Sequence, residues 1–131
     1  MKMISILMAL GLLVGVAAAQ KYDAKDNAAR KGKLLHVVSF KFKESATKEQ
    51  IKQVEDAFAG LKKKIKEIRE YQSGTNVSPE KHDKGFTHGF ILRFDSAKDR
   101  DAYLVHPDHK EFGKLVGPVL ADVFVIDFWT E

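Results

Sequence analysis

The feature that most constrains the fold is one long apolar stripe at helical spacing. Its members are separated by three or four positions: Ile51, Val54, Phe58, Leu61, Ile65 and Ile68. Thr47 and Gln50 precede the stripe with the spacing of a capping box, in which each side chain bonds the other residue's backbone N–H. The pattern predicts a helix that starts after Thr47 and covers one face of a sheet.

Segments that alternate at strand spacing lie on both sides of this helix. Residues 34–43 and 86–94 alternate with aromatic and β-branched side chains, residues 71–77 form a weaker strand, and residues 121–129 close the chain as a strand. In the first of these strands His36, Val38 and Phe40 fall on one face.

Two further short helices are predicted between the last two strands. Ser96 and Asp99 have the spacing of a second capping box, before a helix that reaches about His106. Pro107 fits the first turn of another helix, which Gly117 and Pro118 end. The order is β-α-β-β-α-α-β. It predicts an α+β, ferredoxin-like fold: a four-stranded antiparallel sheet with helices on one face.

The strands carry apolar side chains on both faces. Val37 opposes Val38 and Phe40, and Phe124 lies opposite Val125. Helices cover only one sheet face in this plan, and a solvated face is expected to be polar. We therefore expect the second face to be covered by a second copy of the chain, so that a homodimer forms an α/β barrel.

The N-terminal residues read as an export signal. Met1-Lys2-Met3 is followed by an apolar or glycine run from Ile4 to Val16 and then by three alanines. This order is typical of a signal peptide over residues 1–19, with an uncleaved anchor as the alternative. Residues 20–33 are then expected to form a flexible spacer, and residues 34–131 the domain. The protein is expected to be periplasmic or secreted, without stable membrane association after cleavage.

Composition excludes several classes of function. The 131 residues include no cysteine, which excludes a disulfide scaffold, a zinc–thiolate site and a thiol nucleophile. The net charge of +4 is too small to indicate nucleic acid. The basic run Lys62-Lys63-Lys64 lies beside the apolar stripe and is interpreted as the solvated face of the helix.

Four short segments together resemble the stress-responsive dimeric α/β-barrel family. They are residues 36–43, residues 74–80, residues 85–88 and, most specifically, the Tyr-x-x-His-Pro-x-His stretch of residues 103–109. The resemblance spans about residues 34–129 and implies two sheets that face each other in an eight-stranded barrel. Some plant members of this family are very stable stress proteins, and most members have no established activity.

One branch of the family is a plant polyketide cyclase that works without metal or cofactor, and we predict none here. The resemblance carries its functional tyrosine and histidine to Tyr103 and His109, and two further histidines to His36 and His88. A tyrosine of that branch corresponds to Phe58, so one hydroxyl of the pocket is missing. Candidate catalytic residues are therefore Tyr103 as donor and His109 as base, and candidate ligand contacts are His36, His88, Phe58 and His106.

Each of these residues also has an architectural interpretation. Pro107 can set a helix start, His106 can cap it and His109 can bond a neighbouring carbonyl. His36 and His88 can be hydrogen-bonded core residues, with ligand contact if they line the barrel interior. A metal site built from His106, Asp108, His109 and Glu111 lacks regular helical spacing, and no metal is predicted.

The sequence thus predicts an exported, homodimeric stress-response domain that is structural or binds a small apolar or aromatic ligand. The alternative is a cofactor-independent, polyketide-cyclase-like lyase with a histidine base. Whether the protein is an enzyme stays open at this stage. A third class is a haem or electron-carrying protein of the related barrel superfamily. Purified protein of this class would absorb visible light, and colourless protein would argue against it.

Overall fold

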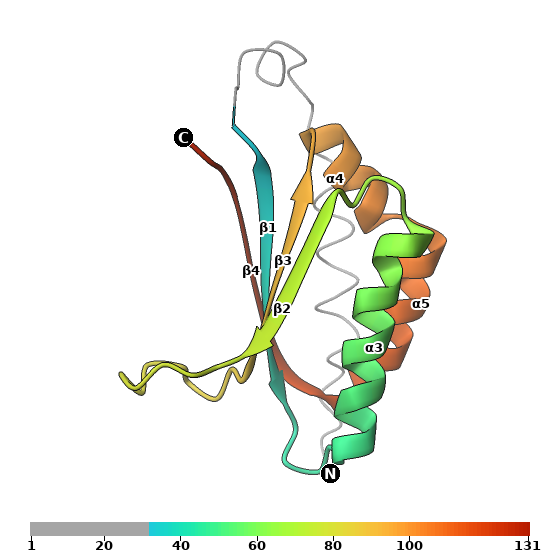
Figure 1. Cartoon of the computed structure of the whole chain (residues 1–131). Helices are drawn as coiled ribbons and strands as arrows, with labels where there is room; N and C mark the ends of the chain where they lie inside the picture. Colours follow the sequence, from blue (N-terminus) through green and yellow to red (C-terminus); the bar gives the residue numbers. More distant parts are fainter. Residues whose placement is uncertain (1–31) are drawn as a thin grey trace.

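The computed structural model describes residues 32–131 and consists of two layers, a sheet and the helices on one of its faces (Figure 1). The elements are β1 (Leu34–Phe42), α3 (Lys48–Lys64), β2 (Glu70–Thr75), β3 (His88–Phe94), α4 (Ala97–Leu104), α5 (Pro107–Val116), the 3₁₀ turn η1 (Gly117–Val119) and β4 (Leu120–Trp129). The predicted element order is confirmed. The predicted signal peptide and nearly all of the spacer lie outside the described residues.

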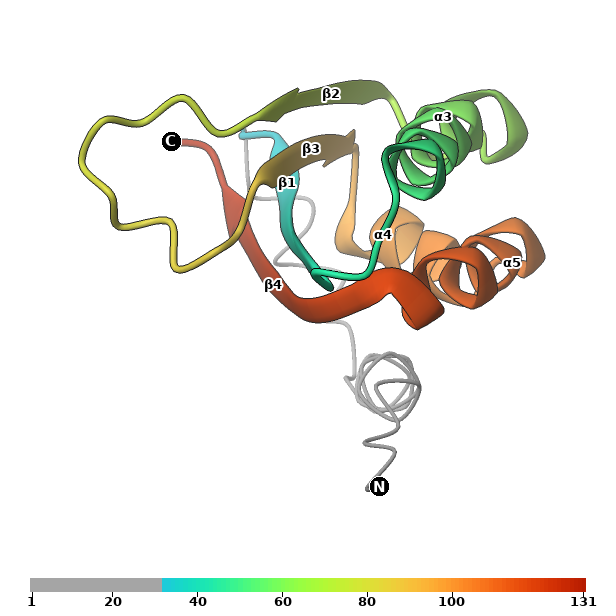
Figure 2. The same cartoon turned by 90° about the horizontal axis from the view of Figure 1, so that it is seen from below.

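The four strands form one antiparallel sheet in the order β2-β3-β1-β4. The predicted ferredoxin-like plan is confirmed. Figure 2 shows α3, α4 and α5 together on one face, whereas the loop of residues 76–87 projects on the other side. We call these the covered face and the open face of the sheet.

Helix α3 starts as the sequence predicts and ends earlier. Thr47 accepts the Gln50 N–H at 3.1 Å, and the Gln50 side chain accepts the Thr47 N–H at 2.9 Å, which completes the capping box. The helix stops at Lys64, and Ile65 has an extended backbone. Ile65 and Ile68 are still buried. The apolar stripe therefore continues into the connection to β2, because packing on the sheet requires apolar side chains there whether or not they are helical.

The chain between β3 and β4 also follows the prediction closely. The Ser96 side chain accepts the Asp99 N–H and caps α4, which ends at Leu104, two residues before the expected end. His106 is the N-cap of α5, and Pro107 occupies the first turn of that helix.

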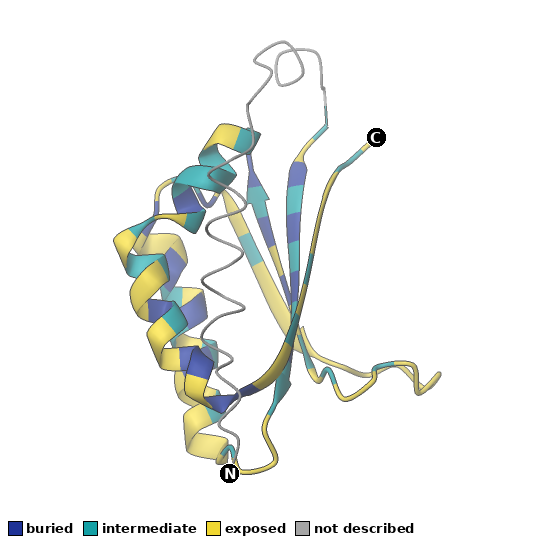
Figure 3. Cartoon of the chain, turned by 180° about the vertical axis from the view of Figure 1, so that it is seen from behind, coloured by how far each residue is buried: buried dark blue, intermediate teal, exposed yellow. Residues whose placement is uncertain are grey.

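The core lies between the two layers and is rich in aromatic rings. Phe58 on α3 stacks on Phe90 with ring centroids 4.5 Å apart and lies 4.7 Å from Phe112 of α5. Phe40 of β1 joins the same group. Figure 3 shows that buried residues gather where the helices and the sheet face each other. Phe58 is thus a central core residue.

The open face carries large apolar side chains that remain partly exposed in the described part of the chain. Ile91, Phe124, Ile126 and Phe128 are between 37% and 49% exposed. A patch of this kind on a sheet marks an interaction surface. Among residues 32–131, no helix is both long and apolar enough to cross a membrane.

Candidate functional site

A row of polar side chains crosses the covered face of the sheet. In the strand register His36 pairs with Asp127 on β4 and with Leu92 on β3, and Leu92 pairs in turn with Tyr71 on β2. Paired residues on neighbouring strands point to the same face. Three of the four residues in this row are therefore polar, although most of the side chains buried in this layer are apolar.

His36 and Asp127 form a short, largely buried pair. The His36 Nδ1 and the Asp127 Oδ1 are 2.6 Å apart, and the two side chains are 6% and 21% exposed. Arg100 of α4 donates to the other Asp127 oxygen at 2.7 Å. Burial acts to raise the pKa of Asp127, but its hydrogen bonds and charge interactions with His36 and Arg100 lower it below the ordinary value. Asp127 is thus held as a carboxylate that orients the imidazole.

Asp101 lies on the far side of Arg100. The Arg100 Nε donates to Asp101 Oδ1 at 2.8 Å, whereas Asp101 Oδ2 is buried without a hydrogen-bond partner. Burial and the negative charge of Asp127 raise the pKa of Asp101 to about 6. Arg100 therefore bridges two carboxyl groups, of which only Asp127 is strongly held in its charged form.

Tyr103 and His109 cover the polar row from the helix layer. Their ring centroids are 4.4 Å apart, and the Tyr103 ring lies 5.7 Å from that of His36. Tyr103 is 1% exposed, and burial raises the pKa of its phenol, which therefore stays protonated. It can donate a hydrogen bond to an oxygen in this layer.

His109 is hydrogen-bonded to a neighbouring backbone carbonyl, as its architectural interpretation predicts. Its Nδ1–H donates to the Leu104 carbonyl at 3.1 Å, which leaves the lone pair on Nε2. Burial lowers the pKa of His109 to about 4, although the bond to Leu104 acts in the opposite direction. The charges of His36 and His106 lower the pKa further, so His109 is neutral at pH 7.

Tyr71 brings a second phenol to this layer. Its ring packs 5.5 Å from that of Phe58, and its hydroxyl oxygen is buried without a hydrogen-bond partner. Burial raises the pKa of Tyr71, the Ser73 hydroxyl lowers it as a hydrogen-bonding group that lies outside full bonding geometry, and the charge of Glu55 raises it. Tyr71 also lies close enough for its ionised form to raise the pKa of Tyr103. The Tyr71 hydroxyl therefore lies beside Phe58, the residue that corresponds to the tyrosine of the cyclase branch and lacks its hydroxyl.

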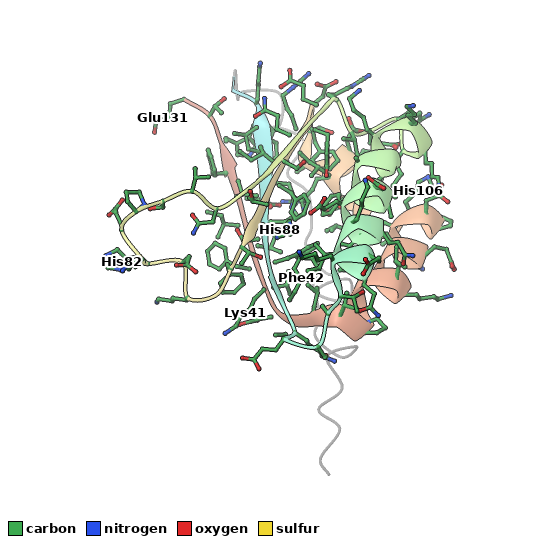
Figure 4. All side chains as sticks on the ribbon, turned by 60° about the horizontal axis from the view of Figure 1, so that its bottom comes forward. Lys41, Phe42, His82, His88, His106 and Glu131 are labelled. Atoms are coloured by element: carbon green, nitrogen blue, oxygen red, sulfur yellow. The ribbon has the colours of Figure 1, made fainter. Side chains whose placement is uncertain are left out.

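His88 lies apart from this group. It pairs with Phe40, two rows along the sheet from Leu92. Its Nε2–H donates to Glu55 of α3 at 2.8 Å, its Nδ1 is 2.8 Å from the Thr87 hydroxyl, and its ring lies 5.0 Å from that of Phe42. Figure 4 shows His88 and Phe42 at the sheet, well separated from His106. His88 thus has the contacts of a hydrogen-bonded histidine that ties the sheet to α3.

His106 is a capping residue. Its Nδ1 accepts the Asp108 N–H at 3.1 Å, which satisfies a free donor at the start of α5. The four residues considered for a metal site do not come together as one, since the described part of the chain holds no group of three or more metal-binding side chains.

Part of this group was therefore predictable from the sequence, and part was not. His36, Tyr103 and His109 come together, whereas His88 and His106 do not join them. Asp127, Arg100 and Tyr71 were missed. One signal was available: Asp127 follows Val123 and Val125 at strand spacing, so it is a carboxylate on a covered face. Of the two interpretations of His36, the structure favours the hydrogen-bonded core residue, because His36 lies buried on the covered face and is bonded to Asp127.

A separate groove lies on the open face. It has a volume of about 770 Å³ and is bordered by β2, β3 and the loop of residues 76–87, which includes His82 and Phe86. Figure 4 places His82 on this projecting loop, on the opposite side of the sheet from His106.

Sequence comparisons find relatives of this chain. Residues 34–130 match the stress responsive A/B barrel domain family. The chain is 33% identical over 98 residues to stress-response A/B barrel domain-containing protein HS1 from Arabidopsis thaliana, a match covering 75% of this chain and 90% of that protein. It is 24% identical over 93 residues to olivetolic acid cyclase from Cannabis sativa, covering 71% and 92%.

Solved structures have the same fold. A hydroxynitrile lyase from Passiflora edulis matches with a TM-score of 0.72 and 25% identity, covering 76% of this chain and 94% of that one. A dimeric protein of unknown function with a ferredoxin-like fold, from Bacteroides fragilis, matches with a TM-score of 0.63 and 25% identity, covering 77% and 99%.

Proposed function

The chain belongs to the stress-responsive A/B barrel domain family, and from this premise we propose that it is an exported homodimer that binds a small, largely apolar ligand at the buried site. The buried site is the set Tyr71, His36, Asp127, Tyr103 and His109. The observation that carries the proposal is the buried, unpartnered hydroxyl of Tyr71. A ligand oxygen that accepts from Tyr71 supplies the missing partner.

The energetics favour a ligand over a purely structural role. A buried polar group without a partner costs about 1–3 kcal/mol. A core built for stability alone would replace such groups with apolar ones, since functional residues commonly cost stability. The aromatic rings of Phe58 and Phe90 beside Tyr71 suit the apolar part of a ligand.

Helix α4 is the element most easily displaced to admit a ligand. Of its eight residues only Tyr103 is buried. Local opening is least costly where few apolar side chains are buried. Movement of α4 carries Tyr103 and Arg100 away from the polar row together, so opening uncovers His36 and Asp127, the residues that these two side chains contact.

Binding is tested with two probes, olivetolic acid and benzaldehyde, on the mature chain by isothermal titration calorimetry. Tyr71→Phe removes one hydroxyl and should weaken binding about five- to tenfold, the value of a neutral hydrogen bond. Lys63→Ala, which changes an exposed side chain on α3, serves as the control and should leave affinity unchanged. Equal affinity of wild type and Tyr71→Phe would contradict the proposal.

A second function, a cofactor-independent lyase, is favoured by the short His36–Asp127 pair. Asp127 accepts the Nδ1–H, so His36 Nε2 carries the lone pair that takes a proton. For a hydroxynitrile, His36 would remove the hydroxyl proton, the C–CN bond would break with its electron pair leaving as cyanide, and the proton would pass to cyanide. The Tyr103 phenol would donate to the carbonyl oxygen that forms.

Mandelonitrile is the probe for this reaction, because its cleavage releases benzaldehyde, which absorbs in the ultraviolet. Turnover should fall by about 100-fold or more in His36→Ala, the usual contribution of a general base. His88→Ala is the matched control and should retain the rate. No turnover by the wild type would reject cleavage of this hydroxynitrile and leave the binding proposal to its own test.

The open face supports the homodimer. Its exposed apolar residues lie on two strands, and the Bacteroides fragilis relative is described as dimeric. Light scattering at micromolar concentration should give twice the chain mass, and a monomer there would contradict the proposal.

Export predicts that mass spectrometry of secreted protein finds Gln20 at the N-terminus, whereas an intact Met1 would contradict cleavage.

A further inference from the structure

Two glycines face each other in the middle of the open face. Gly74 of β2 and Gly89 of β3 are directly paired, and Gly89 also pairs with Ser39 of β1. A Cβ atom added to either glycine would meet nothing within 4 Å. Both lie on the border of the groove described above.

The fold of the single chain does not require glycine at these two positions. Neither has the positive φ that would exclude other residues, which among the described glycines occurs only at Gly85. Glycine inside a strand costs about 0.5–1 kcal/mol relative to alanine. It commonly marks a place where another molecule approaches the backbone closely. The glycine pair therefore points to something that sits above it.

The same cross-sheet row ends in a large side chain. Ser39 pairs with Phe124 of β4, so the row reads Gly74, Gly89, Ser39, Phe124 across the four strands. Phe124 is 49% exposed, and Phe86 of the projecting loop supports its ring at a centroid distance of 6.4 Å. One end of the row is thus a hollow and the other end a protruding ring.

This row is complementary to itself under two-fold symmetry. When two sheets pack face to face about an axis parallel to the strands, each copy's β4 lies over its partner's β2 at the same level. Phe124 of each copy then lies above the partner's glycine pair. A two-fold interface repeats each contact, so the dimer contains this contact twice.

We propose that Phe124 of each copy seats in the hollow over Gly74 and Gly89 of the other copy, and that this contact fixes the register of the dimer. The inference rests on the proposed homodimer and deepens it. The groove volume of about 770 Å³ leaves room for the ring, and Ile91 and Val37 border it with apolar surface. A larger side chain at either glycine would occupy the volume that the ring needs.

The test is the dimer dissociation constant of Gly89→Val and Gly74→Val, measured by analytical ultracentrifugation. Valine favours strands, so each variant should keep the far-ultraviolet circular dichroism of the wild type. The dissociation constant should rise at least about thirtyfold, because overpacking is costly and each dimer contains the contact twice. Gly60→Ala on α3, another glycine with open space around it, is the control and should not change the constant.

A double-variant cycle assigns the effect to Phe124. Phe124→Ala should weaken the dimer, and adding Gly89→Val to it should weaken the dimer no further, because the clashing ring is gone. Additive effects, or valine variants that dimerise as the wild type does, would overturn the inference while leaving the homodimer intact. A wild type that stays monomeric would instead reject the homodimer itself. Valine variants that lose benzaldehyde binding yet dimerise normally would assign the groove to a small molecule, which also overturns the inference.

Discussion

His36 and His109 lie in one core but have different partners. His36 has a carboxylate at 2.6 Å, whereas His109 has only a backbone carbonyl at 3.1 Å. A carboxylate partner can stabilise an imidazolium, and a carbonyl in an apolar layer does so less well. In the lyase reaction proposed above, His36 is therefore the proton acceptor, and neutral His109 contacts the Tyr103 ring.

The depressed pKa of His109 makes stability depend on pH. The unfolded chain binds the proton near pH 6.5 and the folded chain near pH 4. The contribution of neutral His109 to the free energy of unfolding is present above pH 6.5 and is lost as the pH falls toward 4, with a total of about 3 kcal/mol. Urea unfolding between pH 4 and 7 measures this free energy for wild type and His109→Gln, and it should fall more steeply toward low pH for the wild type. Parallel curves would contradict this environment for His109.

The sequence indicated the residues that local motifs mark, and it missed those that need the strand register. Tyr103 and His109 belong to one short motif. Asp127 meets His36 only because β1 and β4, which are 91 residues apart at this point, pair in one register. Tyr71 lies on a strand with weak alternation, so its face could not be predicted.

Helix α3 holds the two layers together. Phe58, Val54 and Leu61 are its buried residues, and the capping box fixes where it starts. Its start was predictable because capping is a local hydrogen-bond pattern. Its end was not, because neither glycine nor proline stops the helix and the apolar spacing continues through Ile65 and Ile68.

A charge at Phe58 should prevent folding. Phe58→Asp places a carboxylate among the rings of Phe90 and Phe112, where an unpaired charge cannot be accommodated. Circular dichroism should show an unfolded chain. Ala59→Asp, one position along and exposed, should fold as the wild type does. A folded Phe58→Asp would contradict the position of this ring in the core.

The two faces of the sheet carry the two proposed binding surfaces of the molecule, one for the ligand and one for the second copy. The covered face holds the buried site, and the open face holds the row that ends in Phe124. Because the sheet lies between them, a variant that weakens the dimer leaves the covered face intact. The presence of apolar residues on both faces was predictable from the strand pattern, whereas the assignment of the histidines to the covered face required the fold.

Dimer formation should make thermal stability depend on concentration. A hundredfold increase in protein concentration favours a dimer by about 2.7 kcal/mol through mass action. This should raise the midpoint of unfolding by several degrees for a domain of this size. Calorimetry at two concentrations measures it. A midpoint that does not change would indicate a monomeric folding unit.

The proposed ligand lies on the covered face, next to the phenol of Tyr71. A crystal structure of the mature protein soaked with olivetolic acid tests this position most directly. We expect density between the sheet and α4, with a ligand oxygen within hydrogen-bonding distance of the Tyr71 hydroxyl. Density only in the open-face groove, with the Tyr71 hydroxyl bonded to Ser73, would contradict the claim.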